Sequence, residues 1–423
     1  MRFAKYTHQL VDKNNNLINR HFIVLKEGSS VVKWTDIHKY TKNSRKRRVV
    51  AITSEGERRF DCVVMLLNYA FFDNYSITRL TELNIDIIKD FLRDYGMCRL
   101  KGDNDRTRRS KNTVEDCINC VLDFCENLAE SEKNISFKKK DLYKEIRTYS
   151  KARRRYVTKK VPTFEVNYVA APESHIFRDM SEGVFQILMN NIYENHKDIL
   201  ILAALSAFAG LRPSEACNVR REDSPLGAGI RFDTIGTEIA NIYIDLSREV
   251  NIRSDLKSVG GIKKPRTQKV YPAFIEAFYD CYRTYMDYCE GKPYEAEYGA
   301  LTNNSNGKAM TYASYREKFQ KAVKECIPKL LASGEEDLII YGHILMEHNV
   351  SPHILRHWFS VKITLYGATA ADLMYWRGDK SPESALTYLQ DKSELEKMYE
   401  EVNNKSFDYQ MWKAAKKQND QSE

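Results

Sequence analysis

The segment HILRH at residues 353–357 places two histidines and an arginine within five positions. On a helix these residues share one face, and two hydroxyl residues continue it at steps of three and four. The polar face comprises His353, Arg356, His357, Ser360 and Thr364. Apart from Lys362, the surrounding residues are mostly apolar, which predicts a buried helix with a narrow cationic strip. The strip could be an anion site at the base of a cleft, or two satisfied histidines beside a solvated arginine.

A second segment, AFAGLRPSEACNV at 207–219, holds another arginine at a chain reversal. Gly210 suits the end of one helix and Pro213 the first turn of the next. Arg212 therefore lies at a sharp junction where a side chain can be held rigidly. Glu215 follows one turn later and can orient its guanidinium.

Two further segments supply a lysine and a tyrosine. GGIKKPRTQKVYP at 260–272 carries lysines at the tip of a hairpin predicted from strands at 240–246 and 268–274. GDKSPESALTYLQ at 378–390 contains a helix start at residues 381–383, with Tyr388 on the second turn.

In this order, the segments resemble the tyrosine recombinases, also called phage integrases. AGLRPSE matches the family box GLR-x-SE, HILRH matches H-x-x-R-H, and PESALTYL matches the nucleophile segment. Tyr388 follows Arg356 by 32 residues, as the family pattern requires. The resemblance covers roughly 173–390, and 58–160 more loosely. It implies that Tyr388, Arg212, Arg356, His353 and one lysine are catalytic, with Glu215, His357 and Asp379 in support.

The resemblance leaves a choice of lysine, and the chain departs from the family pattern at one supporting position. The family lysine lies about eight residues before the end of the loop, which indicates Lys264, with Lys263 and then Lys257 as alternatives. The family usually has His or Trp nine residues before the tyrosine, where this chain has Asp379. An aspartate supplies neither a cationic donor nor an apolar buttress. Either Trp376 or His357 substitutes, or activity is reduced.

The chemistry implied by the resemblance is attack of a tyrosine hydroxyl on a DNA phosphodiester, giving a 3′-phosphotyrosine and a free 5′-hydroxyl. The covalent intermediate conserves the bond energy, so no ATP, cofactor or metal is expected. Two arginines suit the negative charge of the transition state. The lysine would protonate the departing 5′-oxygen, and His353 would donate to or accept from the same centre.

Composition places the chain among globular proteins of more than one domain. It has 423 residues, 43% hydrophobic and 29% charged, and no apolar run approaches the length of a bilayer. The N-terminus lacks the apolar stretch of a signal peptide. We therefore expect a cytoplasmic protein, associated with the bacterial nucleoid, whose nine cysteines are reduced.

The net charge of +8 is unevenly distributed. Residues 138–160 contain eleven Lys or Arg against two Asp or Glu, interleaved with tyrosines. Such a run favours double-stranded DNA as partner, although a solvated linker has the same composition. The predicted DNA-binding residues are Lys138, Lys139, Lys140, Arg153, Arg154, Arg155, Lys159 and Lys160.

Periodicity predicts a mainly α fold with a small antiparallel sheet, an α+β class in which a helical domain and a catalytic domain clamp DNA. Helices are expected at 60–72, 80–96, 112–131, 180–195 and 197–209, with Thr113 as a cap, and strands at 21–25 and 49–52. The predicted divisions are an extension at 1–57 that could bind arm sites, a helical domain at 58–160, a linker at 161–172, a catalytic domain at 173–410 and a charged tail at 411–423. An insertion is expected between about 285 and 345.

The sequence thus favours a site-specific recombinase or integrase of a mobile genetic element. By resemblance the active form is a homotetramer on two sites, with an accessory DNA-bending protein as a further partner. Two alternatives stay open. One is a type IB topoisomerase that relaxes DNA by the same chemistry, and the other is a DNA-binding protein that keeps the fold but has lost cleavage.

Overall fold

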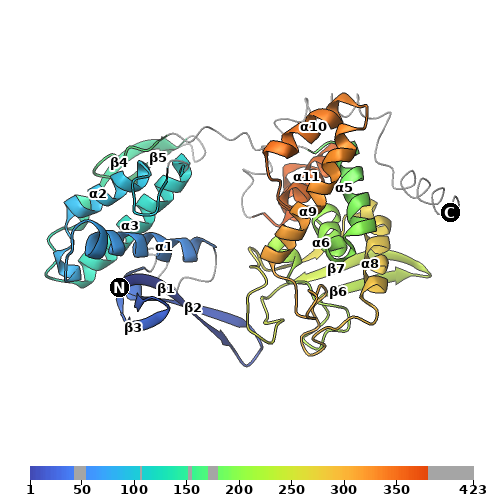
Figure 1. The fold of residues 1–423 in the computed structure, drawn as a ribbon, viewed down its shortest axis with the longest axis horizontal. Coiled ribbons are helices and arrows are strands. Elements are labelled where there is room, and N and C mark those ends of the chain that lie inside the picture. Colours follow the sequence, from blue (N-terminus) through green and yellow to red (C-terminus); the bar gives the residue numbers. More distant parts are fainter. Residues whose placement is uncertain (42–53, 105–106, 151–154, 170–179, 380–423) are drawn as a thin grey trace. The chain divides into compact units, whose positions relative to one another are not determined.

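The structure, a computed structural model, describes residues 1–41, 54–104, 107–150, 155–169 and 180–379 (Figure 1). The chain divides into two compact units, one formed by Met1–Leu10 with Ile18–His175 and the other by Val11–Leu17 with Ile176–Glu423. Helices dominate the described residues, and the sheets are small, so the predicted α+β class is confirmed. None of the described helices is long and apolar enough to cross a lipid bilayer.

The first unit combines a three-stranded sheet, a set of helices and a separate hairpin. Its elements are β1 (Arg2–Val11), β2 (Leu17–Glu27), β3 (Ser30–Trp34), α1 (Ser54–Asn68), α2 (Ile85–Gly96), α3 (Lys111–Ser131), α4 (Lys139–Leu142), β4 (Tyr143–Ser150) and β5 (Arg155–Pro162). The sheet order is β1-β2-β3. The strand predicted at 21–25 is confirmed within β2, and the one at 49–52 lies outside the described residues.

The three helices predicted in this unit are present with shifted ends. A π-helical turn, Tyr69–Asp73, extends α1, and Asn84 caps α2 through hydrogen bonds from the second and third residues of the helix. The predicted cap at Thr113 is wrong. Ser110 has the extended backbone that a cap requires, and its side chain accepts a 3.3 Å hydrogen bond from the Thr113 N–H.

The basic segment of residues 138–160 contains a β-hairpin in its described part, rather than the solvated linker that its composition also allowed. β4 and β5 pair antiparallel, with Tyr149 opposite Tyr156 and Tyr143 opposite Pro162. Tyr, Ile, Val and Thr favour strands. Lysines and arginines on both faces hide the alternation that would have revealed these strands in the sequence.

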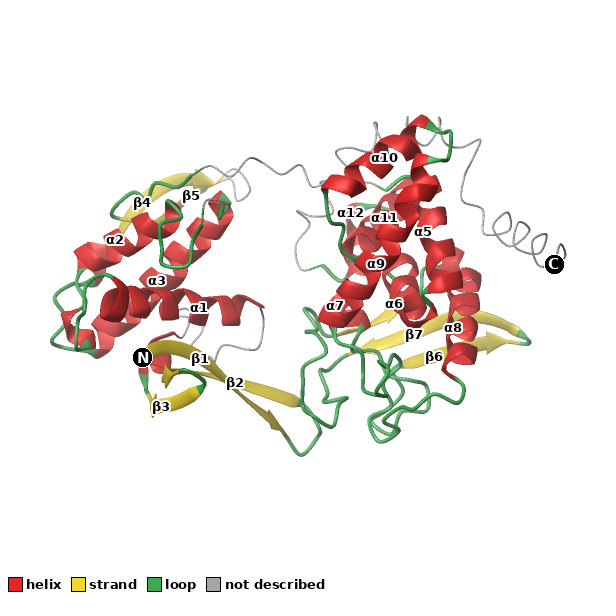
Figure 2. Ribbon diagram, in the orientation of Figure 1, coloured by secondary structure: helices red, strands yellow, loops and turns green. Residues whose placement is uncertain are grey.

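The second unit packs helices against another three-stranded sheet (Figure 2). Its elements are α5 (Glu182–Asn195), α6 (Lys197–Phe208), α7 (Pro213–Ala216), β6 (Ile230–Ile235), β7 (Glu238–Leu246), β8 (Arg266–Lys269), α8 (Ile275–Cys289), α9 (Tyr312–Leu331), α10 (Glu336–Glu347), α11 (His353–Leu365) and α12 (Ala370–Arg377). The region predicted as an insertion forms the end of α8, a loop, α9 and α10.

Helix α6 forms the centre of this unit. Every residue from Ile199 to Phe208 is buried, and α5, α8, α9 and α11 all contact it. A helix that is apolar on all sides can only be stable when other elements surround it. The junction after α6 is therefore held by the core of the unit.

The predicted buried helix at 353–365 is confirmed as α11. Trp358 stacks on Phe185 of α5, with ring centroids 3.6 Å apart and planes within 4°. Lys362, the charge that interrupts the apolar pattern, forms a buried 2.8 Å ion pair with Glu182 of α5. The Ser360 hydroxyl donates to a carbonyl within the helix. Polar groups on this helix are thus satisfied without exposing it.

The sheet β6-β7-β8 differs from the sequence prediction in two ways. The pairing of β7 with β8 confirms the predicted hairpin, but β8 ends at Lys269 because Pro272 starts a 3₁₀ turn. Strand β6 was not predicted. In β8, Arg266 lies opposite Leu246, which anchors the lysine loop of residues 247–265 to the sheet.

Candidate functional site

The turn between α6 and α7 positions Arg212. Gly210 has a φ of +64°, and a Cβ there would lie 2.5 Å from the Phe359 ring, so the turn requires glycine. Arg212 donates from Nη1 to Oε1 of Glu215 at 3.0 Å, and its backbone N–H donates to Oε2 at 3.2 Å. The predicted orienting role of Glu215 is present in the structure.

The Glu215 carboxylate links three segments of the chain. It is fully buried and accepts hydrogen bonds from Arg212, from Arg266 of β8 at 2.9 and 3.2 Å, and from the Lys263 backbone N–H at 3.3 Å. Burial alone would raise the pKa of Glu215. The hydrogen bond and charge of Arg266, with the charge of Arg212, outweigh burial and hold the pKa below its ordinary value.

The lysine loop is fastened to α7. The Asn218 side chain donates to the Gly260 carbonyl at 2.8 Å, and the Ser214 hydroxyl donates to the Gly261 carbonyl at 3.1 Å. Gly260 passes so close that a Cβ there would lie 2.6 Å from the Ser214 carbonyl oxygen. These bonds fix the backbone of the loop just before Lys263 and Lys264.

Among the three lysine candidates, Lys264 is the one whose amino group is seen to bond to Asp379, the residue that the arginines contact. Its amino group donates to the backbone carbonyl of Asp379 at 3.3 Å. The side chain of Lys263 is exposed, although its backbone bonds to Glu215. Lys257 lies further back in the loop, where its backbone N–H donates to Asp255.

Arg356 is buried, with 4% of its area exposed. Its Nη1 donates to the Gly210 carbonyl, and its Nη2 donates to Oδ1 of Asp379 at 2.9 Å. Burial, followed by the charges of Arg212 and Arg377, lowers the pKa of the Arg356 guanidinium to about 9. The group is therefore still protonated at neutral pH, with few water molecules to solvate its charge.

The Asp379 carboxylate contacts both arginines. Arg212 donates from Nη2 to the same Oδ1 at 2.6 Å, and the Arg377 Nε lies 3.0 Å from Oδ2. Gly378, in the left-handed region at the end of α12, allows the Asp379 N–H to bond to the Met374 carbonyl at 3.0 Å. The helix end thus aims this carboxylate at the arginines.

His353 opens α11 beside the same arginines. Partial burial, followed by the charges of Arg356 and Arg212, lowers the pKa of His353 to about 4, although more than a third of its surface is exposed. The imidazole is therefore neutral at pH 7. His357 is partly buried one turn along, and the Trp376 ring packs on Tyr271 at 5.0 Å.

Two arginines of this cluster were missed from the sequence. Arg266 binds Glu215, and Arg377 pairs with Asp379. The spacing of Lys264, Arg266 and Gln268, across the start of β8, was a usable signal for Arg266, because alternate residues of a strand share a face. Tyr388 lies outside the described residues.

The predicted DNA-binding lysines of the first unit fall into two groups. Lys139 and Lys160 pair with the buried Glu126 at 2.6 and 2.7 Å, whereas Lys138, Lys140 and Arg155 are exposed. Lys159 belongs to β5, but its side chain is outside the described part, as are Arg153 and Arg154. Two of the predicted contacts therefore have an intramolecular partner.

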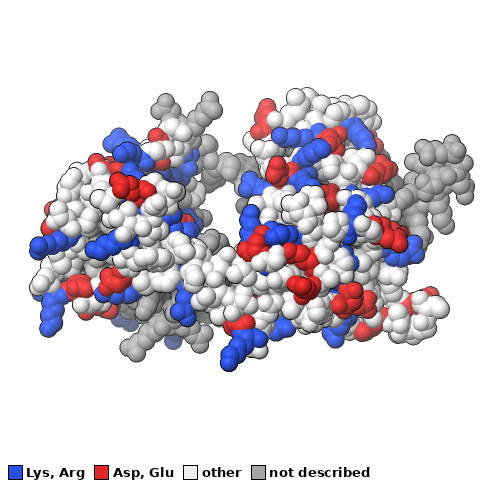
Figure 3. Space-filling model, turned by 60° about the horizontal axis from the view of Figure 1, so that its bottom comes forward, with Lys and Arg blue, Asp and Glu red and all other residues white. Residues whose placement is uncertain are grey.

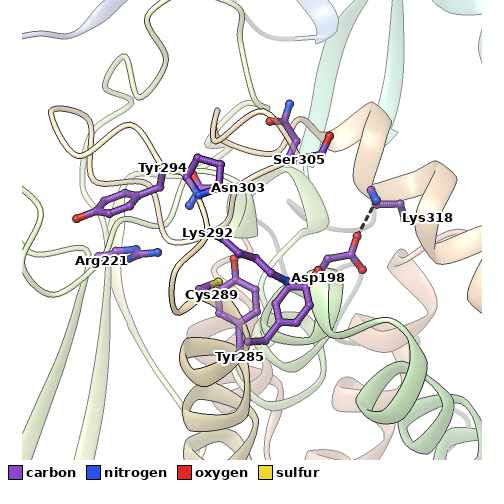
Figure 4. Close-up of a pocket in the computed structure, with 12 residues that line it drawn as sticks. Asp198, Arg221, Tyr285, Cys289, Lys292, Tyr294, Asn303, Ser305 and Lys318 are labelled. Atoms are coloured by element: carbon purple, nitrogen blue, oxygen red, sulfur yellow. Dashed lines mark ion pairs between the residues drawn. The ribbon is translucent and has the colours of Figure 1, made fainter.

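A cavity of about 350 Å³ lies in the second unit among α6, α8, α9 and the loop between α8 and α9 (Figure 4). Lys318 pairs with Asp198 there at 2.6 Å, and the Arg221 guanidinium covers the Tyr294 ring at 4.2 Å. No predicted catalytic residue lines it. It is separate from the arginine cluster.

The surface of the described residues carries both charge signs. Figure 3 shows Lys and Arg interspersed with Asp and Glu across the face that it draws. Among the described residues, no three His, Cys, Asp or Glu side chains form a group that could hold a metal ion. The arginine cluster is largely buried, with 4% of Arg356 and 6% of Asp379 exposed.

Comparison with known proteins finds similarity only among solved structures, since no family model and no curated protein matches the chain. The XerH site-specific recombinase bound to difH substrate is 14% identical, with a TM-score of 0.45, over 79% of this chain and 76% of that one. The XerA recombinase is 16% identical, with a TM-score of 0.36, over 86% and 95%. The Tn1549 transposon integrase with circular intermediate DNA is 14% identical, with a TM-score of 0.49, over 83% and 94%.

Replacing Glu215 with glutamine should destabilise the second unit. The change keeps the shape but removes the charge that compensates Arg212 and Arg266, and breaking a buried ion pair typically costs about 3–5 kcal/mol. Urea unfolding of the full chain measures this. The matched control is Glu238→Gln on an exposed strand end, where we expect a change below about 0.5 kcal/mol. Equal stability of the two variants would contradict the role given to Glu215.

His353 should titrate near pH 4 rather than near 6.5. Because its pKa in the folded chain is lowered, the unfolded chain binds the proton first, so the folded chain loses stability as the pH falls from about 6.5 to about 4. NMR of histidine-labelled protein would follow the ring, with His353→Gln identifying its signal. The variant should lose less stability over this range. A titration near 6.5 would show that the guanidiniums do not act on the ring.

Proposed function

We propose that the chain is a tyrosine recombinase, an enzyme that cuts and rejoins DNA through a 3′-phosphotyrosine intermediate. One observation carries the proposal. Arg212 and Arg356, from distant segments, direct their Nη2 atoms at one oxygen of Asp379, with the Lys264 amino group on the same residue. Two guanidiniums that converge on one carboxylate oxygen, with an ammonium on the backbone carbonyl of the same residue, suit a phosphodiester.

The arginines would act on the charge of the transition state. When a nucleophile attacks phosphorus, negative charge spreads over the non-bridging oxygens. Because Arg212 and Arg356 are already held by Glu215 and the Gly210 carbonyl, they need no reorganisation to bind those oxygens. Rigid donors in a site with little water are the arrangement that lowers such a barrier most.

Three other side chains would complete the reaction. The Tyr388 oxygen forms the bond to phosphorus, and the bond from phosphorus to the 5′-oxygen breaks. Lys264 gives its proton to the departing 5′-oxygen, and the neutral His353 can accept the proton that Tyr388 releases. The phosphotyrosine retains the energy of the phosphodiester, so rejoining by a 5′-hydroxyl needs neither ATP nor a metal in this scheme.

The basic segment of residues 138–160 would contact the DNA backbone. Lys138 and Lys140, at α4, and Arg155, at the start of β5, are exposed, whereas Lys139 and Lys160 are paired with Glu126. Phosphate contacts provide affinity and salt dependence without sequence choice. Recombination between two DNA sites would further require several copies of the chain, which by resemblance form a tetramer.

A DNA-binding protein without cleavage is the second candidate. The observation that favours it is Asp379 itself, because its carboxylate lies where the substrate phosphate would bind. A chain that never releases this contact would bind DNA yet leave it uncut. Covalent trapping separates the two candidates.

The full chain should form a covalent adduct with nicked duplexes chosen from a random library by binding. Cleavage next to a nick releases a short fragment that diffuses away, so the phosphotyrosine accumulates and can be seen on a denaturing gel. The adduct should persist in EDTA and disappear in Tyr388→Phe. Tyr375→Phe, an exposed tyrosine on α12, is the matched control and should react normally. Binding without any adduct would favour the second candidate.

Removing two exposed lysines should reduce the salt dependence of DNA binding. For Lys138→Ala with Lys140→Ala, the slope of log K against log salt should fall in magnitude by about 2, since each phosphate contact contributes about 0.9. Fluorescence anisotropy at several salt concentrations measures this. The control, Lys160→Ala, removes a partner of buried Glu126 and should chiefly lower the melting temperature. An unchanged slope in the double variant would exclude Lys138 and Lys140 from the DNA interface.

A further inference from the structure

The position of Asp379 in the arginine cluster raises the question of what its carboxylate does there. Oδ1 accepts from Arg212 at 2.6 Å and from Arg356 at 2.9 Å, and Arg377 lies 3.0 Å from Oδ2. With 6% of its area exposed, Asp379 is among the buried charged residues. The single carboxylate oxygen that bridges the two guanidiniums takes a place that one charged oxygen of a phosphate could occupy.

Asp379 is not needed to position the arginines. Arg212 has Glu215 as partner for Nη1, and Arg356 has the Gly210 carbonyl. In both residues Nη1 provides the support, and Nη2 faces Asp379. The two Nη2 atoms are therefore the part of the cluster available to an anion, and Asp379 fills that place.

The site requires an anion whether or not DNA is bound. Arg356 is buried beside the cations Arg212 and Arg377, an arrangement that lowers its pKa. An isolated guanidinium in such surroundings is costly unless a negative charge compensates it. Asp379 supplies that charge in this structure, and a phosphate could replace it without leaving the cluster unbalanced.

We infer that Asp379 is an intramolecular substitute for a phosphate, which occupies the anion site formed by Arg212 and Arg356 and must be displaced before a phosphate group can bind. The Lys264 amino group contacts the backbone of the same residue, so displacement would also release the lysine. The ligand class is a phosphate monoester or diester. Its identity as a DNA phosphodiester rests on the proposed function, but the anion site does not.

The test is anion binding by the full chain, with inorganic phosphate as the probe. The main variant is Asp379→Asn, which keeps the shape and one acceptor oxygen but removes the charge. Melting temperatures are recorded in increasing phosphate, with chloride keeping the ionic strength constant, and calorimetry gives Kd. Asp379→Ser provides a second variant in case the first folds poorly, and both can be refolded in phosphate.

Wild type and Asp379→Asn should differ in melting temperature and in phosphate binding. In chloride Asp379→Asn should melt earlier, because its arginines lack an anion, and phosphate should restore its stability. Its Kd for phosphate should be at least about tenfold lower than that of the wild type, because the two bonds to the arginines that compete with phosphate lose the charge of their acceptor. Glu238→Gln controls for net charge and should resemble the wild type. Adding Arg212→Lys to Asp379→Asn should abolish the gain.

Two results would overturn the inference. Equal or weaker phosphate binding by both Asp379 variants would make the residue a positioning residue for the arginines. A gain that survives Arg212→Lys would place the anion elsewhere. Covalent trapping is independent of both results. An adduct in the wild type without a gain in phosphate binding would sustain the proposed function alone, and a gain without an adduct would sustain the anion site alone.

Discussion

The buried carboxylate of Glu215 is the interaction on which the candidate site depends. It joins the turn after α6, the lysine loop and strand β8 through side-chain and backbone hydrogen bonds. A charge buried this deeply is tolerated only because its partners are themselves charged and well oriented. Because Glu215 is held in the core of the unit, the core and not the surface determines the geometry of Arg212.

In the rest of the site, buried positive charges are compensated by carboxylates because little water is present to solvate them. Its cations are Arg212, Arg266, Arg356, Arg377 and Lys264, and the carboxylates that compensate them are Glu215 and Asp379. Glu215 is committed to the scaffold, since it is fully buried and bonded on both oxygens. Asp379 follows the last turn of α12 and is the one of the two that a ligand can replace. The excess of positive charge makes the cluster selective for anions.

Several differences between expectation and structure have a common cause. The hairpin β4-β5 and strand β6 carry charges on both faces or irregular patterns, so the period of two that marks a half-buried strand is absent. These strands are stabilised by pairing with a neighbouring strand although their alternation of apolar and polar residues is weak. Strand pairing joins separate segments of the chain, so the local sequence does not reveal it. Helices α6 and α11 were easier to predict because their apolar residues, repeated over several turns, leave few other arrangements.

The sequence by itself determined the arginine, histidine and lysine candidates and the local features that orient them. The pair Gly210 and Pro213 favours a turn because glycine can adopt the left-handed angles that the turn requires and proline has a fixed φ, and Glu215 reaches Arg212 because the two lie one helical turn apart. Only the tertiary structure decided that Asp379 binds both arginines and that Arg266 supports Glu215. Those contacts join residues distant in the chain, and their energies depend on burial, which no local pattern specifies.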